Sequence, residues 1–179
     1  VYTHIVVNSH DTHQEYARLP HRYAHRLVHI DHGFADKTTV MSQQDARTYF
    51  NLPMDKTIIG CVARLHPLKR IDTLIRMIVF EKNWHLVLVG QGPEKDALEA
   101  LAHKLDVSSR VHFLGEKAPE EIGNTLVAMD IFAFPSEAET FGLAAVEAAQ
   151  AGIPVVAYAL PVLQEVLSDQ EGMPCAELI

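Results

Sequence analysis

Two glutamates stand close together in the segment PSEAETFGLAAVEAAQAGIPVV, which covers positions 135–156. Glu139 comes just before an alanine-rich helical pattern, and Glu147 lies inside it among small residues that leave room for a ligand or another backbone. A carboxylate that meets a ligand there would accept hydrogen bonds from neutral hydroxyl groups. The competing interpretation is a solvent-exposed glutamate on an alanine-rich helix, and spacing alone leaves both open.

The start of the same helix is a candidate anion site. The backbone N–H groups of Phe141, Gly142 and Leu143 would point out of its first turn, where negative charge is favoured without any side chain. Glu139 would lie beside such an anion and would repel a phosphate, unless it binds sugar hydroxyls instead.

Two cations lie in the segment ARLHPLKR. Arg64 and Lys69 are five residues apart in a loop that contains Pro67, so both side chains could turn towards one point. A forked guanidinium together with an ammonium group suits a diphosphate. The alternative is two solvated surface cations.

Two glycine-containing loops are further candidates. Gly90 and Gly92 form a G-x-G in VGQGPEKDAL, but the third glycine of a dinucleotide fingerprint is replaced by Lys95, which speaks against a nicotinamide-dependent oxidoreductase. The G-x-G is either a tight turn or a backbone that a nucleobase or ribose can approach. In FLGEKAPEE, Gly115 ends an apolar run, and the loop is either a base-binding edge or a plain connection.

These loops need a framework, and apolar runs alternate with amphipathic segments to supply one. Strand-like runs lie near 57–63, 85–90, 110–115, 131–135 and 153–158, with a helical pattern after each. The alternation predicts an α/β fold, a Rossmann-like doubly wound parallel sheet. Ligands of such sheets bind beyond the carboxyl ends of the strands, where all four loops would lie.

Composition limits the class of protein. Hydrophobic residues make up 48% and charged residues 21% of the chain, as in ordinary globular proteins. The formal charge of −8 argues against nucleic acid as a partner. The two cysteines, Cys61 and Cys175, cannot form a disulfide framework and suit a reducing cytoplasm. No apolar run approaches the roughly 18 residues of a membrane span.

In the first fifty residues, the alternation of strand-like and helix-like segments is weaker. We expect residues 1–51 to be the remnant of a preceding domain with a linker, and 52–179 to be the ligand-binding domain, incomplete at its carboxyl terminus. Seven histidines lie in this first part: His4, His10, His13, His21, His25, His29 and His32. On a helix, His21, His25 and His29 would share one face, a spacing that can hold a metal. A solvated or packing stripe is the favoured interpretation, since no acidic or cysteine ligand completes the set.

The four loops together resemble the signature of the family-4 retaining glycosyltransferases. Glu139 and Glu147 form that family's E-x7-E motif, and VARLHPLKRID is similar to its G-R-L-x-x-x-K-G-x-D segment. VLVGQGPEKDAL and VHFLG are similar to its next two segments, and HIDHGFAD to its P-N-G-V-D stretch at the domain junction. The resemblance covers roughly residues 52–166. It implies the C-terminal half of a GT-B fold, which consists of two Rossmann-like domains.

The resemblance also implies roles for the candidate residues. Arg64 and Lys69 would hold the diphosphate of a nucleotide-sugar donor, assisted by the backbone at 141–143, while Glu147 would accept hydrogen bonds from the ribose. Glu139 would orient the donor sugar and, with Arg64 and Lys69, form the catalytic set. The base would be lined by the loops at 90–92 and 114–117, with Gly90, Gly92, Leu114 and Gly115 as the candidate residues. No metal and no cofactor is implied, since these cations and the helix start can carry the charge of the leaving diphosphate.

The implied reaction is transfer of a hexosyl group from a UDP- or GDP-linked sugar to a hydroxyl, with retention at the anomeric carbon. The saccharide or lipid-linked acceptor would bind to a missing N-terminal domain, so we expect this chain alone to be inactive or weakly active. Bacterial cell-surface polysaccharide or lipid-linked saccharide synthesis is the commonest setting of the family, and sucrose or glycogen chemistry stays open beside it. We expect a cytoplasmic location, with peripheral attachment to the inner membrane face left open. A nucleotide-sugar epimerase, or a donor-binding module without transfer activity, remains an alternative.

Overall fold

The computed structural model describes residues 3–30, 33, 39–168 and 172–179 of the chain. His32 and most of the HIDHGFAD stretch lie outside the described residues. In the described part, no helix is both long and apolar enough to cross a membrane.

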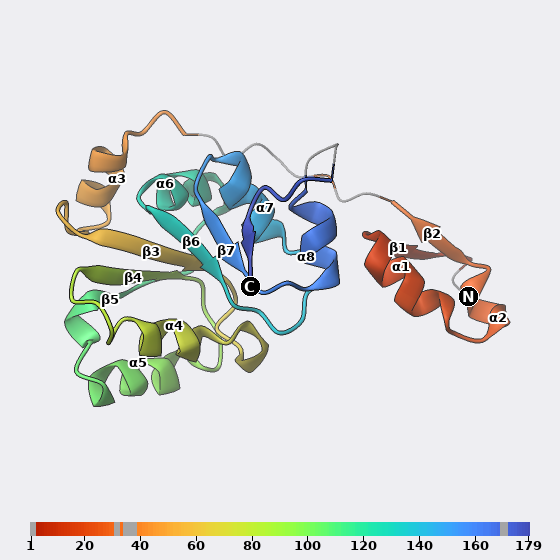
Figure 1. Ribbon diagram of the computed structural model, residues 1–179, viewed down its shortest axis with the longest axis horizontal. Coiled ribbons are helices and arrows are strands. Elements are labelled where there is room, and N and C mark those ends of the chain that lie inside the picture. Colours follow the sequence, from red (N-terminus) through yellow and green to blue (C-terminus); the bar gives the residue numbers. More distant parts are fainter. Residues whose placement is uncertain (1–2, 31–32, 34–38, 169–171) are drawn as a thin grey trace.

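A parallel sheet forms the centre of the larger body (Figure 1). Its strand order is β5-β4-β3-β6-β7-β8, and every neighbouring pair is parallel. The strands are β3 (Thr57–Val62), β4 (Trp84–Val89), β5 (Val111–Gly115), β6 (Ile131–Phe134), β7 (Val155–Ala157) and β8 (Glu177–Leu178). The predicted α/β class with a doubly wound parallel sheet is confirmed, and we call the two ends of its strands the amino edge and the carboxyl edge.

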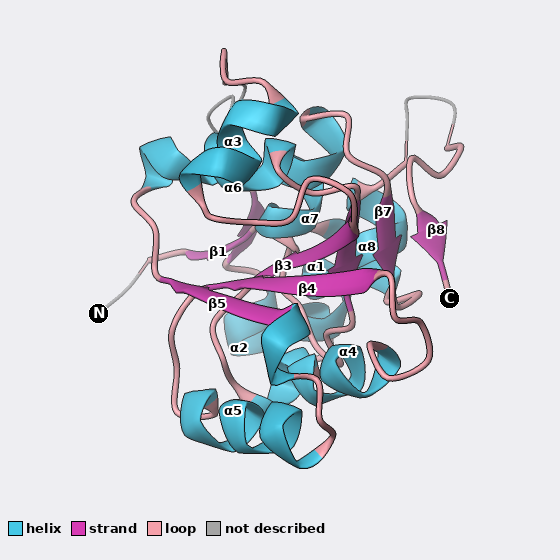
Figure 2. Cartoon of the chain, turned by 90° about the vertical axis from the view of Figure 1, so that its left-hand side faces the viewer, coloured by secondary structure: helices cyan, strands magenta, loops and turns pink. Residues whose placement is uncertain are grey.

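Helices cover both faces of this sheet (Figure 2). One face carries α4 (Ile71–Met77) and α5 (Lys95–Lys104). The other carries α3 (Gln43–Tyr49), α6 (Ile122–Val127), α7 (Leu143–Gln150) and α8 (Pro161–Val166). Three short 3-10 turns complete the connections: η1 (Pro67–Lys69), η2 (Ser108–Arg110) and η3 (Pro119–Glu121).

The sheet divides the apolar interior into two cores because neighbouring strand residues point to opposite faces. Ile58 packs with α6, α7 and α8, whereas the next residue, Ile59, packs with α4 and α5. Strands that are buried on both faces consist mainly of consecutive apolar residues. Polar and apolar residues therefore do not alternate regularly in β3 or β4.

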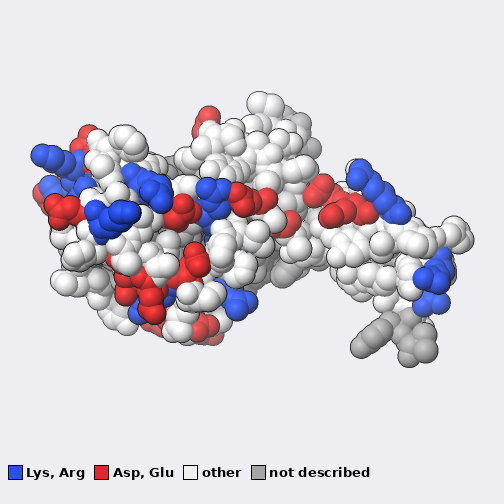
Figure 3. All heavy atoms as spheres, turned by 90° about the horizontal axis from the view of Figure 1, so that it is seen from below, with Lys and Arg blue, Asp and Glu red and all other residues white. Residues whose placement is uncertain are grey.

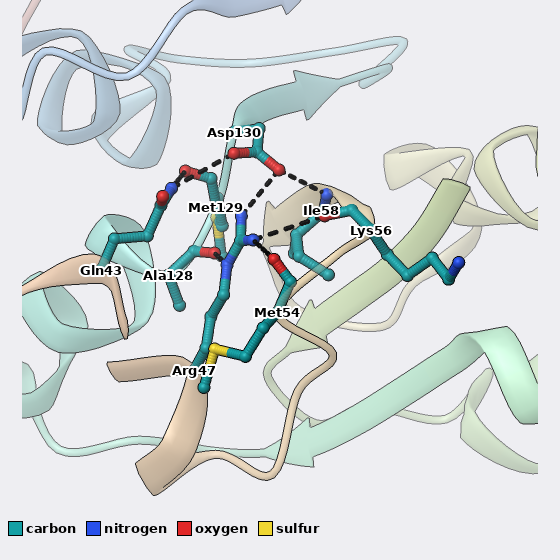
Figure 4. Close-up of polar contacts among 8 residues, drawn as sticks. All are labelled: Gln43, Arg47, Met54, Lys56, Ile58, Ala128, Met129 and Asp130. Atoms are coloured by element: carbon teal, nitrogen blue, oxygen red, sulfur yellow. Dashed lines mark hydrogen bonds and ion pairs between the residues drawn. The ribbon is translucent and has the colours of Figure 1, made fainter. Parts of the chain in front are cut away.

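Helix α3 is fastened to the amino edge by a buried arginine (Figure 4). The Arg47 side chain is 6% exposed and donates to the carbonyl groups of Ala128, Met54 and Lys56 at 3.0, 3.3 and 3.4 Å. It also pairs with Asp130 at 2.7 Å. Asp130 in turn accepts hydrogen bonds from the Ile58 N–H at 2.7 Å and from Gln43 at 3.2 Å. The network locks α3 to the starts of β3 and β6.

A smaller unit precedes this body and lies at one end of the molecule in Figure 1. It contains β1 (Ile5–Val7), α1 (His10–Ala17), α2 (His21–Ala24) and β2 (Leu27–His29), with β1 and β2 parallel. Helix α1 contacts α8 of the larger body. The division at residues 51 and 52 stays a prediction.

The expected histidine stripe on one helix does not form. Helix α2 ends at Ala24, and His29 belongs to β2 because the segment Leu27–His29 pairs with β1. His21 and His25 still stack, with ring centroids 5.6 Å apart. The spacing argument therefore failed for His29, which lies near a different set of residues.

Charged side chains of both signs are interspersed on the face shown in Figure 3. Lysines and arginines alternate there with aspartates and glutamates over the larger body, and no broad positive patch covers it. A face that binds the phosphate backbone of a nucleic acid typically carries such a patch.

Candidate functional site

The strand order reverses direction between β3 and β6, and the candidate site lies at that point. The chain runs outwards from β3 to β4 and β5, then returns to the other side of β3 with β6. The loops that leave β3 and β6 at the carboxyl edge therefore diverge, which opens the crevice where parallel α/β sheets bind ligands. Arg64 and Lys69 follow β3, and Glu139 follows β6.

The structure brings Lys69 and Glu139 together across this crevice. The Lys69 ammonium group forms an ion pair and hydrogen bond with Glu139 Oε1. Their side chains are 23% and 10% exposed. The ammonium group also lies 5.7 Å from the ring centroid of Phe134, the last residue of β6. The pair is thus partly desolvated but still reachable from solvent.

A second ion pair joins the same two loops. Arg70 pairs with Glu137, and the Glu137 N–H donates to the Leu68 carbonyl at 2.9 Å. The neighbouring Glu137 carboxylate raises the pKa of the Arg70 guanidinium above its usual value. Arg70 has φ of 48°, a left-handed conformation that turns η1 into α4. These contacts fix the separation of the two loops on either side of the Lys69–Glu139 pair.

The Gly90–Gly92 loop is tight because another loop lies against it. A Cβ atom on Gly90 would meet the Ala63 carbonyl oxygen at 2.0 Å, and one on Gly92 would meet the Leu65 carbonyl oxygen at 2.2 Å. Gly90 also has φ of 134°, which favours glycine. Both glycines are therefore required by contact with the loop after β3.

Arg64 lies over a hollow that these glycines line. The hollow has a volume of about 490 Å³ and is lined by Arg64, Gly90, Gln91, Gly92 and Glu116. Arg64 is exposed and, among the described residues, makes no ion pair. An open polar hollow with one unpaired guanidinium at its rim is suited to an anion.

Neither Gly115 nor Leu114, the other predicted base-lining residues, lines this hollow. Gly115 ends β5 in a left-handed conformation with φ of 71°, and its carbonyl oxygen accepts from the Gly90 N–H at 2.8 Å. Leu114 packs against the core and is not among the residues that line the hollow.

Gly142 precedes the first residue of helix α7, Leu143, and has a left-handed conformation with φ of 81°. A Cβ atom on Gly142 would lie 2.4 Å from the Leu163 side chain, so this position favours glycine for two reasons. No side chain caps the helix start, which Phe141 and Leu143 flank. Glu147 lies one turn further along and is 8% exposed.

Two buried groups lie beneath the site. Burial raises the pKa of the Cys61 thiol to about 12, so this residue is a buried neutral thiol rather than a nucleophile. Ser136, directly after Pro135, is 1% exposed, and its hydroxyl has no hydrogen-bond partner in the part of the chain that the structure describes.

Sequence reasoning found part of this edge and missed part of it. Gln91 and Glu116 line the hollow with Arg64, and both lie inside the predicted base-lining loops at 90–92 and 114–117. The contact in which the Thr140 carbonyl accepts from the Ser9 hydroxyl at 3.3 Å was not predicted. Nothing in the sequence indicates that Ser136 is buried or that Ser9 contacts Thr140.

Comparison with known sequences identifies relatives. Residues 42–177 match the family model described as glycosyl transferases group 1. The chain is 39% identical over 140 residues to the D-inositol 3-phosphate glycosyltransferase of Mycolicibacterium smegmatis, a match that covers 75% of this chain and 32% of that protein. The same-named protein of Mycobacteroides abscessus is 38% identical over 131 residues, covering 70% and 29%.

Solved structures share the fold. Anabaena HepE in complex with UDP and glucose superposes with a TM-score of 0.82 at 26% identity, over 99% of this chain and 49% of HepE. Sucrose-phosphate synthase from Thermosynechococcus elongatus gives a TM-score of 0.82 at 29% identity, over 97% and 44%. The chain thus spans about a third of the curated relatives and about half of these structures. Since the family model matches most of its length, the chain belongs to the glycosyl transferases group 1 family.

Proposed function

We propose that the carboxyl edge of the sheet binds the nucleoside-diphosphate sugar donor of a retaining family-4 glycosyltransferase with a GT-B fold. The observation that carries this proposal is the Lys69–Glu139 pair across the crevice. A lysine ammonium group has three donors, so Lys69 can keep Glu139 and also bind a phosphate oxygen. Its charge offsets that of Glu139, which would otherwise repel the diphosphate.

The remaining groups have positions that suit the same ligand. Arg64 would bind the diphosphate from the rim of its hollow, and the start of α7 at Gly142 would add backbone N–H groups. Glu147 would accept hydrogen bonds from the ribose, and Glu139 from the donor sugar. The Gly90–Gly92 loop and Gly115 would lie along the base, with Leu114 behind them.

Catalysis would consist mainly of leaving-group stabilisation and positioning. The bond between the anomeric carbon and the diphosphate oxygen breaks, the acceptor oxygen bonds to that carbon, and the acceptor proton leaves with the diphosphate. Arg64, Lys69 and the α7 start meet the charge that develops on the diphosphate, so the reaction would need neither a metal nor a cofactor.

Several finer points rest on relatives. HepE is solved with UDP, with UDP-glucose, and with UDP and glucose, which supports UDP over GDP as the nucleotide. A hexosyl group, a saccharide or lipid-linked acceptor, and a role in polysaccharide synthesis are proposals for the whole protein. The cytoplasmic location and attachment to the inner membrane face stay predictions.

Calorimetric titration of this chain with UDP and GDP in EDTA, then in Mg²⁺, tests the donor site. We expect metal-independent UDP binding that Arg64→Ala and Glu147→Gln each weaken by about 10-fold or more, the equivalent of about 1.4 kcal/mol. Arg76→Ala and Glu99→Gln, which change exposed residues on α4 and α5, are the matched controls. A folded chain that binds neither nucleotide, or equal losses in the controls, would overturn the proposal.

An epimerase, or a donor-binding module, would share the same binding results. Incubation with UDP-glucose and no acceptor separates them, since an epimerase would convert the sugar and a binding module would leave it unchanged. The proposed transferase requires acceptor-dependent release of UDP by the whole protein, with the α-linkage of the donor kept in the product.

A further inference from the structure

Three potential metal ligands from distant parts of the chain meet beside α1. His10 opens that helix, His29 ends β2, and Glu165 lies on α8. Their candidate ligand atoms, the imidazole nitrogens and a carboxylate oxygen, all lie within 4.8 Å of one another. Within the described ranges, this is the one such group of three or more His, Cys, Asp or Glu residues.

The carboxylate of the group is already oriented by the backbone. Glu165 Oε1 accepts from the His10 N–H at 2.8 Å, and Oε2 accepts from the Asp11 N–H at 3.0 Å. Each carboxylate oxygen has a further lone pair, so these bonds leave Glu165 able to bind a cation. Hydrogen bonds of this kind hold a ligand in the direction that a metal requires.

The two imidazoles belong to the smaller N-terminal unit, whereas Glu165 belongs to the larger body. The His10 and His29 rings have centroids 4.2 Å apart and are tilted by 47°. His10 is exposed and free to rotate, whereas His29 is half-buried and its Nε2 is shielded from solvent. Two imidazole rings and one carboxylate thus lie close together. Their nitrogen and oxygen lone pairs can all bind the same cation.

Local charge also favours a cation. The start of α1 carries about half a positive charge from its helix dipole, which opposes cation binding. The full negative charge of Glu165 exceeds it, and Asp11 in the first turn adds another. The balance at this point is therefore negative.

We propose that His10, His29 and Glu165 form a binding site for a borderline divalent transition-metal ion such as Zn²⁺, with water as the fourth ligand. Zinc bonds of about 2.0–2.2 Å place tetrahedral ligand atoms about 3.4 Å apart, so rotation of the exposed His10 ring closes the remaining gap. Imidazole ligands select Zn²⁺ and similar ions, while Mg²⁺ and Ca²⁺ prefer oxygen ligands.

Such an ion would tie the small N-terminal unit to α8. The same junction includes the Ser9 hydroxyl, which donates to the Thr140 carbonyl at 3.3 Å, one residue from Glu139. The metal would therefore stiffen the contact between the two parts of the chain without entering the donor site. This role is independent of the proposed donor binding.

The experiment is calorimetric titration of the EDTA-treated, dialysed chain with ZnCl2, together with CoCl2 titration followed by visible absorption. We expect one ion per chain and the intense absorption of tetrahedral cobalt. His10→Ala, His29→Ala and Glu165→Gln should each weaken zinc binding by about 10-fold or more, since even changes behind the ligands reach that range. His10→Ala is the sharpest variant, because the hydrogen bonds to Glu165 come from backbone N–H groups and survive it.

Matched controls use the other histidine pairs. His21→Ala/His25→Ala and His112→Ala remove the stacked pairs elsewhere, and zinc affinity should stay within about 2-fold of the parent value. Zinc should also raise the Tm of the parent chain but not that of His10→Ala. Unchanged affinity in His10→Ala, equal loss in the controls, or equal binding of MgCl2 would each overturn the proposal.

Discussion

The two edges of the central sheet each carry a cation–carboxylate pair, and the pairs differ in how fully their hydrogen-bonding groups are used. At the amino edge, Arg47 bonds three carbonyl groups as well as Asp130. At the carboxyl edge, the ammonium group of Lys69 has Glu139 as its one hydrogen-bond partner among the described residues. The first pair is complete as it stands, and the second retains donors for a ligand.

This difference separates stability from binding. The Arg47 side chain is 6% exposed and makes four hydrogen bonds, so its removal is costly because Asp130 and three carbonyl groups lose their donor. The Lys69–Glu139 pair is buried to a similar extent, but the Lys69 ammonium group makes one hydrogen bond to the described part of the chain, so its other donors remain available to a ligand. The sheet therefore has one edge that holds the fold and one that is available for chemistry.

The largest expected effect is at the amino edge. Arg47→Met removes the donor from three carbonyl groups and leaves Asp130 without its cation. We expect a loss of about 3 kcal/mol in the free energy of unfolding, measured by urea denaturation. Arg76→Ala, at an exposed arginine, should change it by less than about 0.5 kcal/mol. A loss below about 1 kcal/mol for Arg47→Met would contradict the contrast between the edges.

The reverse pattern is expected at the carboxyl edge. Lys69→Met keeps an apolar stem near Phe134 and removes the charge beside Glu139. We expect UDP affinity to fall by about 10–100-fold, equal to about 1.4–2.8 kcal/mol. The free energy of unfolding should fall by less than the roughly 3 kcal/mol expected for Arg47→Met, because one side-chain hydrogen bond is lost instead of four. Calorimetry and urea denaturation measure the two effects. Equal affinity for the parent and variant chains would remove Lys69 from the donor site.

Helix α7 runs from one edge to the other and allows a matched glycine test. Gly142 and Gly152 flank it with φ of 81° and 76°, so alanine strains the backbone at both positions. At Gly142 the added Cβ also overlaps fully buried Leu163, whereas at Gly152 it meets open space. We expect losses of about 2 kcal/mol for Gly142→Ala and about 1 kcal/mol for Gly152→Ala by urea denaturation. Equal losses would show that Leu163 adjusts freely.

The smallest expected effect depends on pH. His85 and His112 lie near the starts of β4 and β5, with Nδ1 of His85 and Nε2 of His112 3.0 Å apart. Burial lowers the pKa of both imidazoles in the folded chain, and for His85 the neighbouring His112 lowers it further. The unfolded chain therefore binds more protons as pH falls below about 6.5, so stability is complete above that value and declines beneath it.

Urea midpoints at pH 7.5 and 5.5 measure this decline. His112→Gln should flatten the pH dependence, because it removes one titrating group and relieves the other. If the parent chain is equally stable at both pH values, or if the variant loses as much stability as the parent between them, the histidine pair is not the source of the pH dependence.

The sheet was predictable because its strands are buried on both faces. Each predicted apolar run contains a strand, since a short, continuously apolar segment between helices fits a strand covered on both faces. These runs lie near 57–63, 85–90, 110–115, 131–135 and 153–158. Helix α3 was missed, although Ser42 caps it by accepting from the Asp45 N–H, a signal visible in the sequence. Strand β8 has only two residues, Glu177 and Leu178, and its pairing with β7 leaves no local signature.

The candidate site was predictable as a set of loops but not as contacts. Parallel strands place Arg64, Lys69 and Glu139 at one edge, and that inference needs only the order of elements. The ion pair between Lys69 and Glu139 depends on the conformations of two loops, and the spacing of residues in the sequence does not predict these conformations. The glycines at 90 and 92 were interpreted as a route for a ligand or a tight turn, and contacts with Ala63 and Leu65 now explain both positions.

The way α1 begins has a consequence for the order in which the chain can fold. Its first four N–H groups bond to Glu165, Glu165, the Ser9 hydroxyl and the Ser9 carbonyl in turn. The first of these bonds spans 155 residues of sequence. At a synthesis rate of about 5–20 residues per second, the start of α1 waits roughly 8–30 seconds on the ribosome for its partner. Helix α1 is thus made before α8 but completed only after α8 has emerged.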